Sequence, residues 1–531
     1  MRAEKNSRTK PRKKTTTRIL KLVLALIVVL IVLILFLIPA FVSSGKGRQI
    51  ILAKINNSIS GRTNFADLSM GWFRGINVAD VSFKDNAGQI AVHVKQIATK
   101  PHYGSILTGN LSFGETIIDE PKVEINLKDL QREPSAGKRA RPVMLPIKNI
   151  DLVLNDGDLK VTDPKANTVE LSQINSKVNL RPPGQQTNFD LNMAVVDGGK
   201  ASKIQVASQI TPKKQTGWTL EGTSGNLTVE VNDLDIESLG PLFALAGVEV
   251  QAKGLIGGQV KSEIKDGRLE NLSGDIKGKN LDITSAKLKG DRLQTSSLDV
   301  GIKLNRQKET INIDNLQIKS DWAFVKASGV VPTTFKSFAD FFQADSNYNL
   351  EGNFNCDVAA VLSQMPKTLG LKEGMKITSG RLDGNIETST GAGQRQIQAQ
   401  GTLAGLEGTV EGKKIALSEP VKAQAQMSSG KAGINFDKLD VSAPFAKINC
   451  TGTTELLNYN ADVDLDKLQS ELGQFINAGQ YQMAGELLGK GQISIKEKKI
   501  TTSGSSVVKN LRLSSKEAVT ASEPMANVAF A

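Results

Sequence analysis

The sequence predicts a mainly β protein: one N-terminal transmembrane helix followed by an elongated, twisted antiparallel β-sheet groove, built from repeats with a few short amphipathic helices. Apolar and polar residues alternate with period two along most of the chain after residue 60, which is typical of strands with one wet and one apolar face. Aromatic residues make up only 5% of the 531 residues, whereas glycines number 48, so one closely packed core is not expected. A strand, a short helix and a glycine-containing strand pair also recur three times, which predicts an elongated array.

The N-terminal segment is predicted to anchor the chain in a membrane. Residues 19–42 include an uncharged run, Leu22–Val42, long enough as a helix to cross a hydrocarbon core of ~30 Å. The residues before this run are strongly basic, so the positive-inside rule places the tail, residues 1–18, in the cytoplasm. A cleaved signal peptide is the alternative, but its apolar region spans only ~7–15 residues, and we therefore expect a retained anchor.

The region after the anchor, residues 43–131, begins with an amphipathic stretch. Gln49–Ser60 is predicted to be a helix that stops at Gly61, since glycine readily takes the left-handed conformation that ends helices. Contact with the membrane surface, plugging the end of the sheet and ordinary packing are all open roles for it. Its apolar residues are Ile51, Leu52, Ile55 and Ile59.

The net charge of +12 suggests nucleic-acid binding at first sight, but its distribution does not. Removing the nine basic residues and one acidic residue of the first 21 leaves 57 basic and 53 acidic residues. The one local basic cluster, in the Pro/Gly-containing residues 132–142, has no aromatic residue on which bases would stack. We interpret it as a solvated linker and expect no nucleic-acid partner.

The remaining body is predicted to be one sheet of sequential hairpins. Residues 143–234 continue the groove, and three β repeats follow at 235–356, 357–463 and 464–531. The third repeat stops within a strand-like pattern, for which truncation and an open edge for a partner strand are both open explanations. Apolar residues of the alternating runs are candidates to line the groove: Val123, Ile125, Leu127, Val229, Val231, Leu298, Val300, Ile302, Ile311, Ile313, Ala461 and Val463.

Residue patterns for catalysis, cofactors or metals are missing from the sequence, so no enzyme is expected. The two histidines, His93 and His102, have no metal-ligand spacing. The aspartates at 462, 464 and 466 lack the turn glycine and closing glutamate of a calcium loop, and are interpreted as the polar face of a strand. Cys356 and Cys450 are expected to be buried free thiols, with one long-range bridge as the open alternative.

The stretch Gly61–Leu127 resembles the N-terminal region of AsmA-like envelope proteins. The resemblance is carried by Asp67–Phe83, which reads DLSMGWFRGINVADVSF, by the strand and small helix of Ile97–Leu111, and by Ile117–Ile125, which reads IIDEPKVEI. Ile150–Val161 is similar to the family's next element, with Asn155-Asp156-Gly157 as its turn. The later repeats are similar only in style.

The resemblance implies a long β-groove that projects from the bacterial inner membrane into the periplasm and serves phospholipid traffic and outer-membrane integrity. We therefore expect a single-pass protein with its bulk in the periplasm, which binds phospholipid acyl chains and conducts them without catalysis. Expected partners are phospholipid, the inner membrane and an outer-membrane or periplasmic protein at the distal end. The alternative is a non-catalytic scaffold or assembly factor for outer-membrane proteins, whose apolar face need not be continuous.

Overall fold

The computed structural model describes residues 36–108, 110–127, 147–197, 200–215, 217–334, 348–371, 374–391, 394–430, 433–453, 455–472, 482–496, 499–514 and 519–530, together with Leu26, Val29 and Leu33. The predicted tail 1–18, most of the anchor 19–42 and the linker 132–142 lie outside these residues. Leu26, Val29, Leu33 and residues 36–42 are helical. No helix in the described part of the chain has both the length and the apolar character needed to cross a bilayer.

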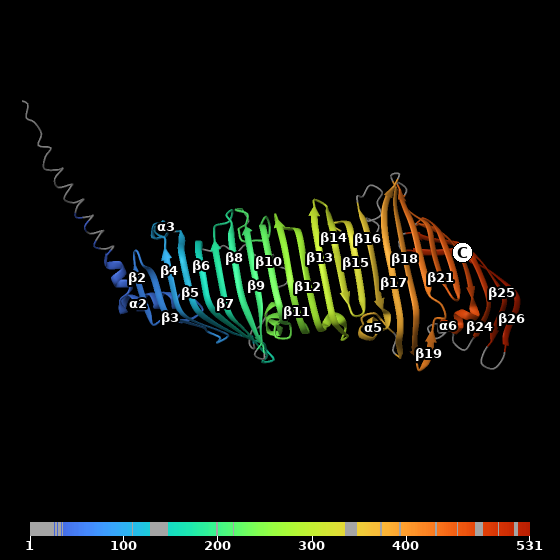
Figure 1. Ribbon diagram of the computed structural model, residues 1–531, viewed down its shortest axis with the longest axis horizontal. Helices are drawn as coiled ribbons and strands as arrows, with labels where there is room; N and C mark the ends of the chain where they lie inside the picture. The colour runs from blue at the N-terminus through green and yellow to red at the C-terminus, as the bar shows by residue number, and fades with distance from the viewer. Residues whose placement is uncertain are drawn as a thin grey trace, which may run out of the picture. The chain divides into compact units, whose positions relative to one another are not determined.

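The chain is mainly β, as predicted, and divides into two units, Met1–Ala194 and Val195–Ala531. The first unit contains α2 (Gly45–Asn56), β1 (Gly61–Asn64), β2 (Asp67–Gly71), β3 (Gly75–Asp85), β4 (Ile90–Pro101), α3 (Tyr103–Leu107), β5 (Leu111–Asn126), β6 (Ile147–Thr162), β7 (Thr168–Leu180) and most of β8 (Thr187–Asp197). Its strands β3 to β7 pair in chain order (Figure 1). The short β1 and β2 both pair with β3.

Two predictions for the first unit are wrong in detail. The sheet is not purely antiparallel, because β5 and β6 run parallel. Asn155-Asp156-Gly157 is not a turn: β6 continues through it as a β-bulge, with Asp156 at φ 49° and a register shift between Leu154 and Gly157. A turn and a bulge need the same left-handed residue, so their local sequences look alike.

Helix α2 exists as expected, but its bounds differ from the predicted Gln49–Ser60. Ser44 caps its first turn by accepting a hydrogen bond from the Gly47 amide, and the helix ends at Asn56, with Asn57 as its C-cap, before Gly61. Gly61 opens β1 instead, where a Cβ would lie 2.5 Å from the Phe83 ring, so close packing explains this glycine. Ile51, Leu52 and Ile55 are half-buried on α2, whereas Ile59 is exposed beyond it.

The second unit is a meander with helices inserted at three places. Its elements are β9 (Lys200–Thr211), β10 (Ser224–Asp235), α4 (Gly240–Ala246), β11 (Val250–Lys265), β12 (Arg268–Ser285), the 3₁₀ helix η1 (Ala286–Leu288), β13 (Arg292–Gln307), β14 (Thr310–Ser320), β15 (Ala323–Pro332), β16 (Asn349–Asp357), α5 (Val358–Gln364), β17 (Met375–Gly391), β18 (Gln394–Val410), β19 (Lys413–Ala416), β20 (Val421–Gly430), β21 (Gly433–Ala443), β22 (Ala446–Thr453), β23 (Leu456–Asp464), α6 (Leu465–Leu472), β24 (Gln482–Lys496), β25 (Lys499–Ser514) and β26 (Val519–Phe530). From β9 on, consecutive strands pair antiparallel, except that the short β19 and the following β20 both pair with β18.

The three helices of the second unit occupy the same edge of the sheet. Each follows one strand of a repeat, β10, β16 or β23, and precedes its antiparallel partner, β11, β17 or β24. An even number of antiparallel pairings separates β10, β16 and β23, so these strands run in one direction and their ends meet one edge.

Candidate functional site

One face of the second unit's sheet is apolar across all of its paired strands. Because the side-chain period of a strand is two, residues opposite one another in register lie on the same face. Register pairs link a first row of residues from β9 to β26, with Ser506 as its only polar member: Ile204, Val231, Gly258, Ile276, Val300, Ile318, Val325, Phe354, Gly384, Gly401, Ala423, Val441, Ile448, Ala461, Gly489, Ser506 and Val528.

A second row lies two residues along each strand, on the same face. It runs from β9 to β25 through Val206, Val229, Val260, Gly274, Ile302, Leu316, Ala327, Gly352, Ile386, Ala399, Ala425, Leu439, Cys450, Tyr459, Gly491 and Gly504. Neither row contains a charged residue. We call the surface that the two rows define the apolar face.

Large side chains of the apolar face are only partly shielded from solvent. Ile318, Val325 and Phe354 face one another across β14, β15 and β16, with exposed fractions of 37%, 37% and 41%. Contiguous exposed apolar side chains are characteristic of surfaces that interact with proteins, membranes or ligands.

The first unit carries the same kind of face on its own sheet. Val92, Val123, Leu159 and Leu171 face one another across β4, β5, β6 and β7. In the next row towards the strand ends, Ile90, Ile125, Val161 and Val169 do the same. Val161 and Val169 are buried, at 0% and 2% exposed, so this part of the unit is more tightly packed.

The candidate groove residues fall on these faces. In the first unit Val123 and Ile125 are half-buried and Leu127, just beyond β5, is 6% exposed. In the second unit, the remaining candidates share the apolar face. Val229, Val231, Val300, Ile302 and Ala461 belong to its two rows, and Leu298, Ile311, Ile313 and Val463 extend it towards the strand ends.

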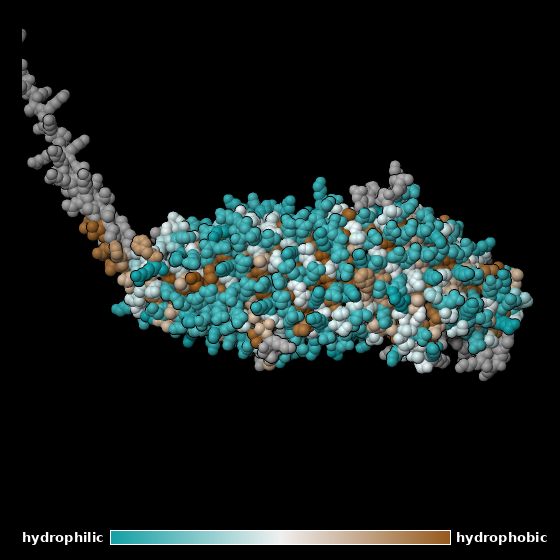
Figure 2. All heavy atoms as spheres, in the orientation of Figure 1, coloured by the Kyte–Doolittle hydropathy of each residue, from teal (hydrophilic) through white to brown (hydrophobic). Residues whose placement is uncertain are grey.

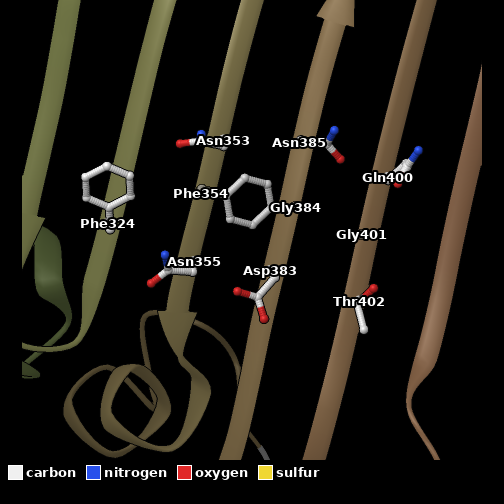
Figure 3. Close-up of a pocket in the computed structure, with 10 residues that line it drawn as sticks. All are labelled: Phe324, Asn353, Phe354, Asn355, Asp383, Gly384, Asn385, Gln400, Gly401 and Thr402. Carbon is white, nitrogen blue, oxygen red and sulfur yellow. The ribbon is translucent and has the colours of Figure 1, made fainter.

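The opposite face of the same sheet is polar and rich in amides. A row between the two apolar rows reads Glu230, Gln259, Asp275, Gly301, Gln317, Lys326, Asn353, Asn385, Gln400, Gln424, Asp440, Asn449 and Asn460. Figure 3 shows part of it, with Asn353, Asn385 and Gln400 side by side on β16, β17 and β18. The surface drawn in Figure 2 is mostly hydrophilic, with smaller hydrophobic areas between.

Asp440 on the polar face has partners on its own strand and on the next one. Asp440 accepts a hydrogen bond from Asn449 at 2.8 Å and forms an ion pair with Lys438 at 2.9 Å. The hydrogen bond from Asn449, followed by that from Lys438, holds the pKa of Asp440 below its ordinary value. Charged and amide side chains of this kind are typical of the solvent-facing side of a sheet.

An aspartate begins each of the three helical insertions and hydrogen-bonds a backbone amide two or three residues further along the chain. Asp235, Asp357 and Asp464 accept hydrogen bonds through Oδ1 from the amides of Glu237, Ala360 and Lys467, at 3.0, 2.9 and 3.0 Å. The polar-strand interpretation of the aspartates at 462, 464 and 466 is wrong for Asp466 alone, because Asp462 and Asp464 both lie in β23. Asp464 caps α6, and Asp466, in its first turn, accepts a hydrogen bond from the Gly485 amide at 3.0 Å.

Bulges follow the helices at equivalent positions. In the first repeat, Gly254 at φ 113° lies against the backbone of Asn280 at φ 51°. In the third, Gly485 at φ 126° lies against Asn510 at φ 50°. The recurring Asn-Leu pairs, Asn280-Leu281 and Asn510-Leu511, therefore mark a shared bulge that bends both strands while keeping their apolar residues on one face.

Sequence reasoning missed the glycines of the apolar face and the rings beside them. A Cβ on Gly384 would lie 2.5 Å from the Phe354 ring, and Gly401 is the next residue in the row. In the third repeat, Cβ atoms on Gly491 and Gly504 would lie 3.0 and 3.1 Å from the Tyr459 hydroxyl. The signal available in the sequence was an aromatic residue in one strand, followed in each of the next two strands by a glycine at the facing register position.

The two histidines and the two cysteines lie at four separate places in the fold. His102 Nδ1 lies 2.8 Å from Ser112 Oγ, and His93 faces Lys122 and Ser82. Cys356 and Cys450 are free thiols, half-buried on the apolar face, and burial raises the pKa of each. No group of three His, Cys, Asp or Glu side chains suited to a metal occurs among the described residues.

Comparison with known proteins identifies a family. A family model described as YhdP protein matches residues 1–334, which is more than half of the chain. Searches of curated proteins and of solved structures gave no match.

Proposed function

Because the chain belongs to the YhdP protein family, we propose that it is a membrane-anchored envelope protein that binds phospholipid acyl chains along its apolar face and conducts them in outer-membrane and cell-envelope biogenesis. Membership of this family, which is of the AsmA-like, bridge-like lipid-transfer type, is consistent with envelope-related lipid transport. The proposal places the N-terminus in the cytoplasm, the anchor in the bacterial inner membrane and the two units in the periplasm. It requires no catalytic residue and no cofactor.

The continuity of the apolar face is the observation that carries the proposal. Each buried CH₂ contributes about 0.8 kcal/mol, so an acyl chain gains from lying on Val, Ile, Leu and Phe side chains at any point of the face. A charged residue in the rows would interrupt that gain, and both rows lack one from β9 to β25. The polar face and its paired charges keep the other side of the same sheet in water.

Glycine and alanine cluster in the rows around β16 to β18 and β22 to β25. Gly384 and Gly401 are consecutive in one row, and Gly491 and Gly504 in the other. The Phe354 ring lies over Gly384, and the Tyr459 hydroxyl lies close to Gly491 and Gly504, so the glycines make room for these aromatic side chains. The aromatic side chains thereby extend the apolar surface across the glycine positions, which supports an acyl chain that moves along the face without a fixed pocket.

Site-specific photocrosslinking in the full-length, membrane-embedded protein tests the proposal. Benzoylphenylalanine at position 302, on the apolar face of β13, is expected to form phospholipid adducts that mass spectrometry identifies. The same probe at position 297, an exposed position on the opposite face of β13, is the control and is expected to form none. Equal adducts at both positions would contradict the assignment of the face.

Conduction is tested with a block at one place and a probe at another. In a chain with benzoylphenylalanine at position 461, Val300→Asp is expected to lower the lipid adduct at least about tenfold, because a charge in an acyl path costs more than the ~1.4 kcal/mol that gives a tenfold effect. Ser297→Asp is the matched control. An unchanged adduct at 461 in Val300→Asp would overturn conduction and favour the scaffold alternative.

A further inference from the structure

The turn between β2 and β3 presents an aromatic tip. Phe73 is fully exposed, at 100%, between Trp72 and an exposed Arg74. The Trp72 ring packs edge-on against Tyr103 of α3, with centroids 4.8 Å apart at 68°, and the Tyr103 hydroxyl donates a hydrogen bond to the Gly71 carbonyl at 3.2 Å. This support from a second element holds the turn in place, so Phe73 projects outward from a fixed base. We call Trp72, Phe73 and Tyr103 the aromatic tip.

Three contacts place the end of the apolar N-terminal run at the tip end of β2. Ser43 Oγ accepts a hydrogen bond from the Met70 amide at 2.9 Å. Further along α2, Arg48 hydrogen-bonds the Ala66 carbonyl. At the end of the helix, Asn56 Oδ1 accepts a hydrogen bond from the Thr63 amide at 2.6 Å. From Ser43 to Asn56 the residue numbers rise, whereas the numbers of their hydrogen-bond partners fall from Met70 to Thr63. The two segments therefore run antiparallel, and Ser43 lies next to the tip.

The helical residues just before Ser43 expose large apolar side chains. Phe36, Leu37 and Phe41 are 76%, 56% and 53% exposed. The junction with α2 is tight, because a Cβ on Gly47 would lie 2.0 Å from the Phe41 carbonyl oxygen. Exposed apolar surface therefore continues from the uncharged run Leu22–Val42 to the aromatic tip.

We propose that the aromatic tip inserts into the interfacial layer of the same bilayer that holds the anchor. This inference rests on the proposed membrane anchor. Tryptophan and tyrosine favour the headgroup level because their rings have an apolar body and a polar end, and Arg74 suits anionic headgroups. A fully exposed phenylalanine on a supported turn is costly in water and favourable in the acyl boundary. The tip then holds the first strands of the sheet against the membrane surface.

Depth-dependent quenching of tryptophan fluorescence in the full-length protein tests the inference. The chain has three tryptophans, so Trp218→Phe with Trp322→Phe leaves Trp72 as the only emitter, and Trp72→Phe with Trp218→Phe leaves Trp322. Each protein is reconstituted in vesicles of phosphatidylethanolamine and phosphatidylglycerol whose acyl chains carry bromine near the headgroup. Trp72 is expected to lose about threefold more of its emission than Trp322.

A substitution at the tip sharpens the test. Phe73→Ser is expected to reduce the quenching of Trp72, whereas Leu220→Ser, which removes a 64% exposed leucine from a turn of the second unit, is expected to leave it unchanged. Quenching of Trp72 no greater than that of Trp322 would overturn the tip's insertion and favour a protein partner or solvent at this turn.

Alkaline extraction of the same vesicles separates the two proposals. If Trp72 is not quenched but the chain stays in the membrane, insertion of the aromatic tip is refuted and the membrane anchor is supported. If Trp72 is not quenched and alkali releases the chain from the vesicles, the membrane anchor is refuted as well. The lipid adduct at position 461 reports on conduction independently of both.

Discussion

At the residue scale, alternation of apolar and polar residues was sufficient to identify much of the apolar face. Val300, Ile302 and Val229 could be assigned because a β-branched residue between polar neighbours has one interpretation in a strand. Gly384 and Gly491 could not, because a glycine in sequence signals a turn, a bulge or a close approach equally well. Only the register shows that these glycines lie beside Phe354 and Tyr459.

The two cysteines provide a check on the apolar face. Burial, with a smaller effect of nearby aspartates, raises the pKa of Cys356 and Cys450, so the reactive thiolate becomes abundant only above the ordinary thiol range. Alkylation by a water-soluble maleimide is expected to be slow at neutral pH, to accelerate as the pH rises, and to be faster after lipid is stripped from the protein.

A thiol on the polar face is the matched reference. In a Cys356→Ser, Cys450→Ser chain, Asn353→Cys places an exposed thiol on the other side of β16. Its alkylation is expected to be faster at pH 7 and indifferent to lipid. Native cysteines that react as fast as this reference would show that they do not lie on a covered apolar face.

At the element scale, the sequence indicated where elements occur better than how they end. The threefold recurrence of a strand, a short amphipathic helix and a glycine-containing strand pair correctly located α4, α5 and α6, because an amphipathic run is a local signal. The turn predicted at Asn155-Asp156-Gly157 and the helix end predicted at Gly61 were wrong. In both cases a partner strand, β7 or β3, decides the conformation, and local sequence does not contain it.

The bulge at Asn280 is expected to depend on its left-handed backbone. Asn280→Val places a β-branched residue at φ 51° and is expected to cost about 1–3 kcal/mol of local stability, whereas Asn280→Gly is expected to be neutral or nearly so. Hydrogen exchange of β11 and β12, followed by mass spectrometry, measures the effect. Equal protection in the two variants would mean that the bulge is not held by this conformation.

At the scale of the whole chain, sequential pairing was predictable from short connections, but the parallel pair was not. Antiparallel hairpins need only a turn, and the turns between most strands are visible in the sequence. The β5–β6 pairing depends on a connection through the Pro/Gly-containing residues 132–142, whose composition is equally suited to a linker. The sequence therefore indicated the alternation and hairpin style of the strands more reliably than the direction of each.

Removal of one whole repeat is expected to preserve the sheet. Deletion of residues 235–356 joins β10 to Asp357, α5 and β17, so Val231 faces Gly384 in place of Gly258. The pairings removed run from β10–β11 to β15–β16, an even number, so every later strand keeps its direction. Far-ultraviolet circular dichroism per residue and resistance to proteolysis are expected to match the parent protein.

Removal of an odd number of strands is the control. Deletion of β13, β14 and β15 reverses the direction required of β16 and is expected to give a protease-sensitive protein. If both shortened chains were equally resistant, or equally sensitive, strand direction would not be what the repeats preserve.

The order of strand pairing also affects how the chain can fold while it is being synthesised. From β9 to β26 each strand finds its partner in residues made shortly before it, so the sheet extends by adding one finished edge after another, with little closure entropy at any step. The exception is early: β5 waits for β6, which is complete only at Thr162. We therefore expect the parallel pair to be the slow event of synthesis, after which folding keeps pace with elongation and each new strand leaves only one unpaired edge exposed to aggregation.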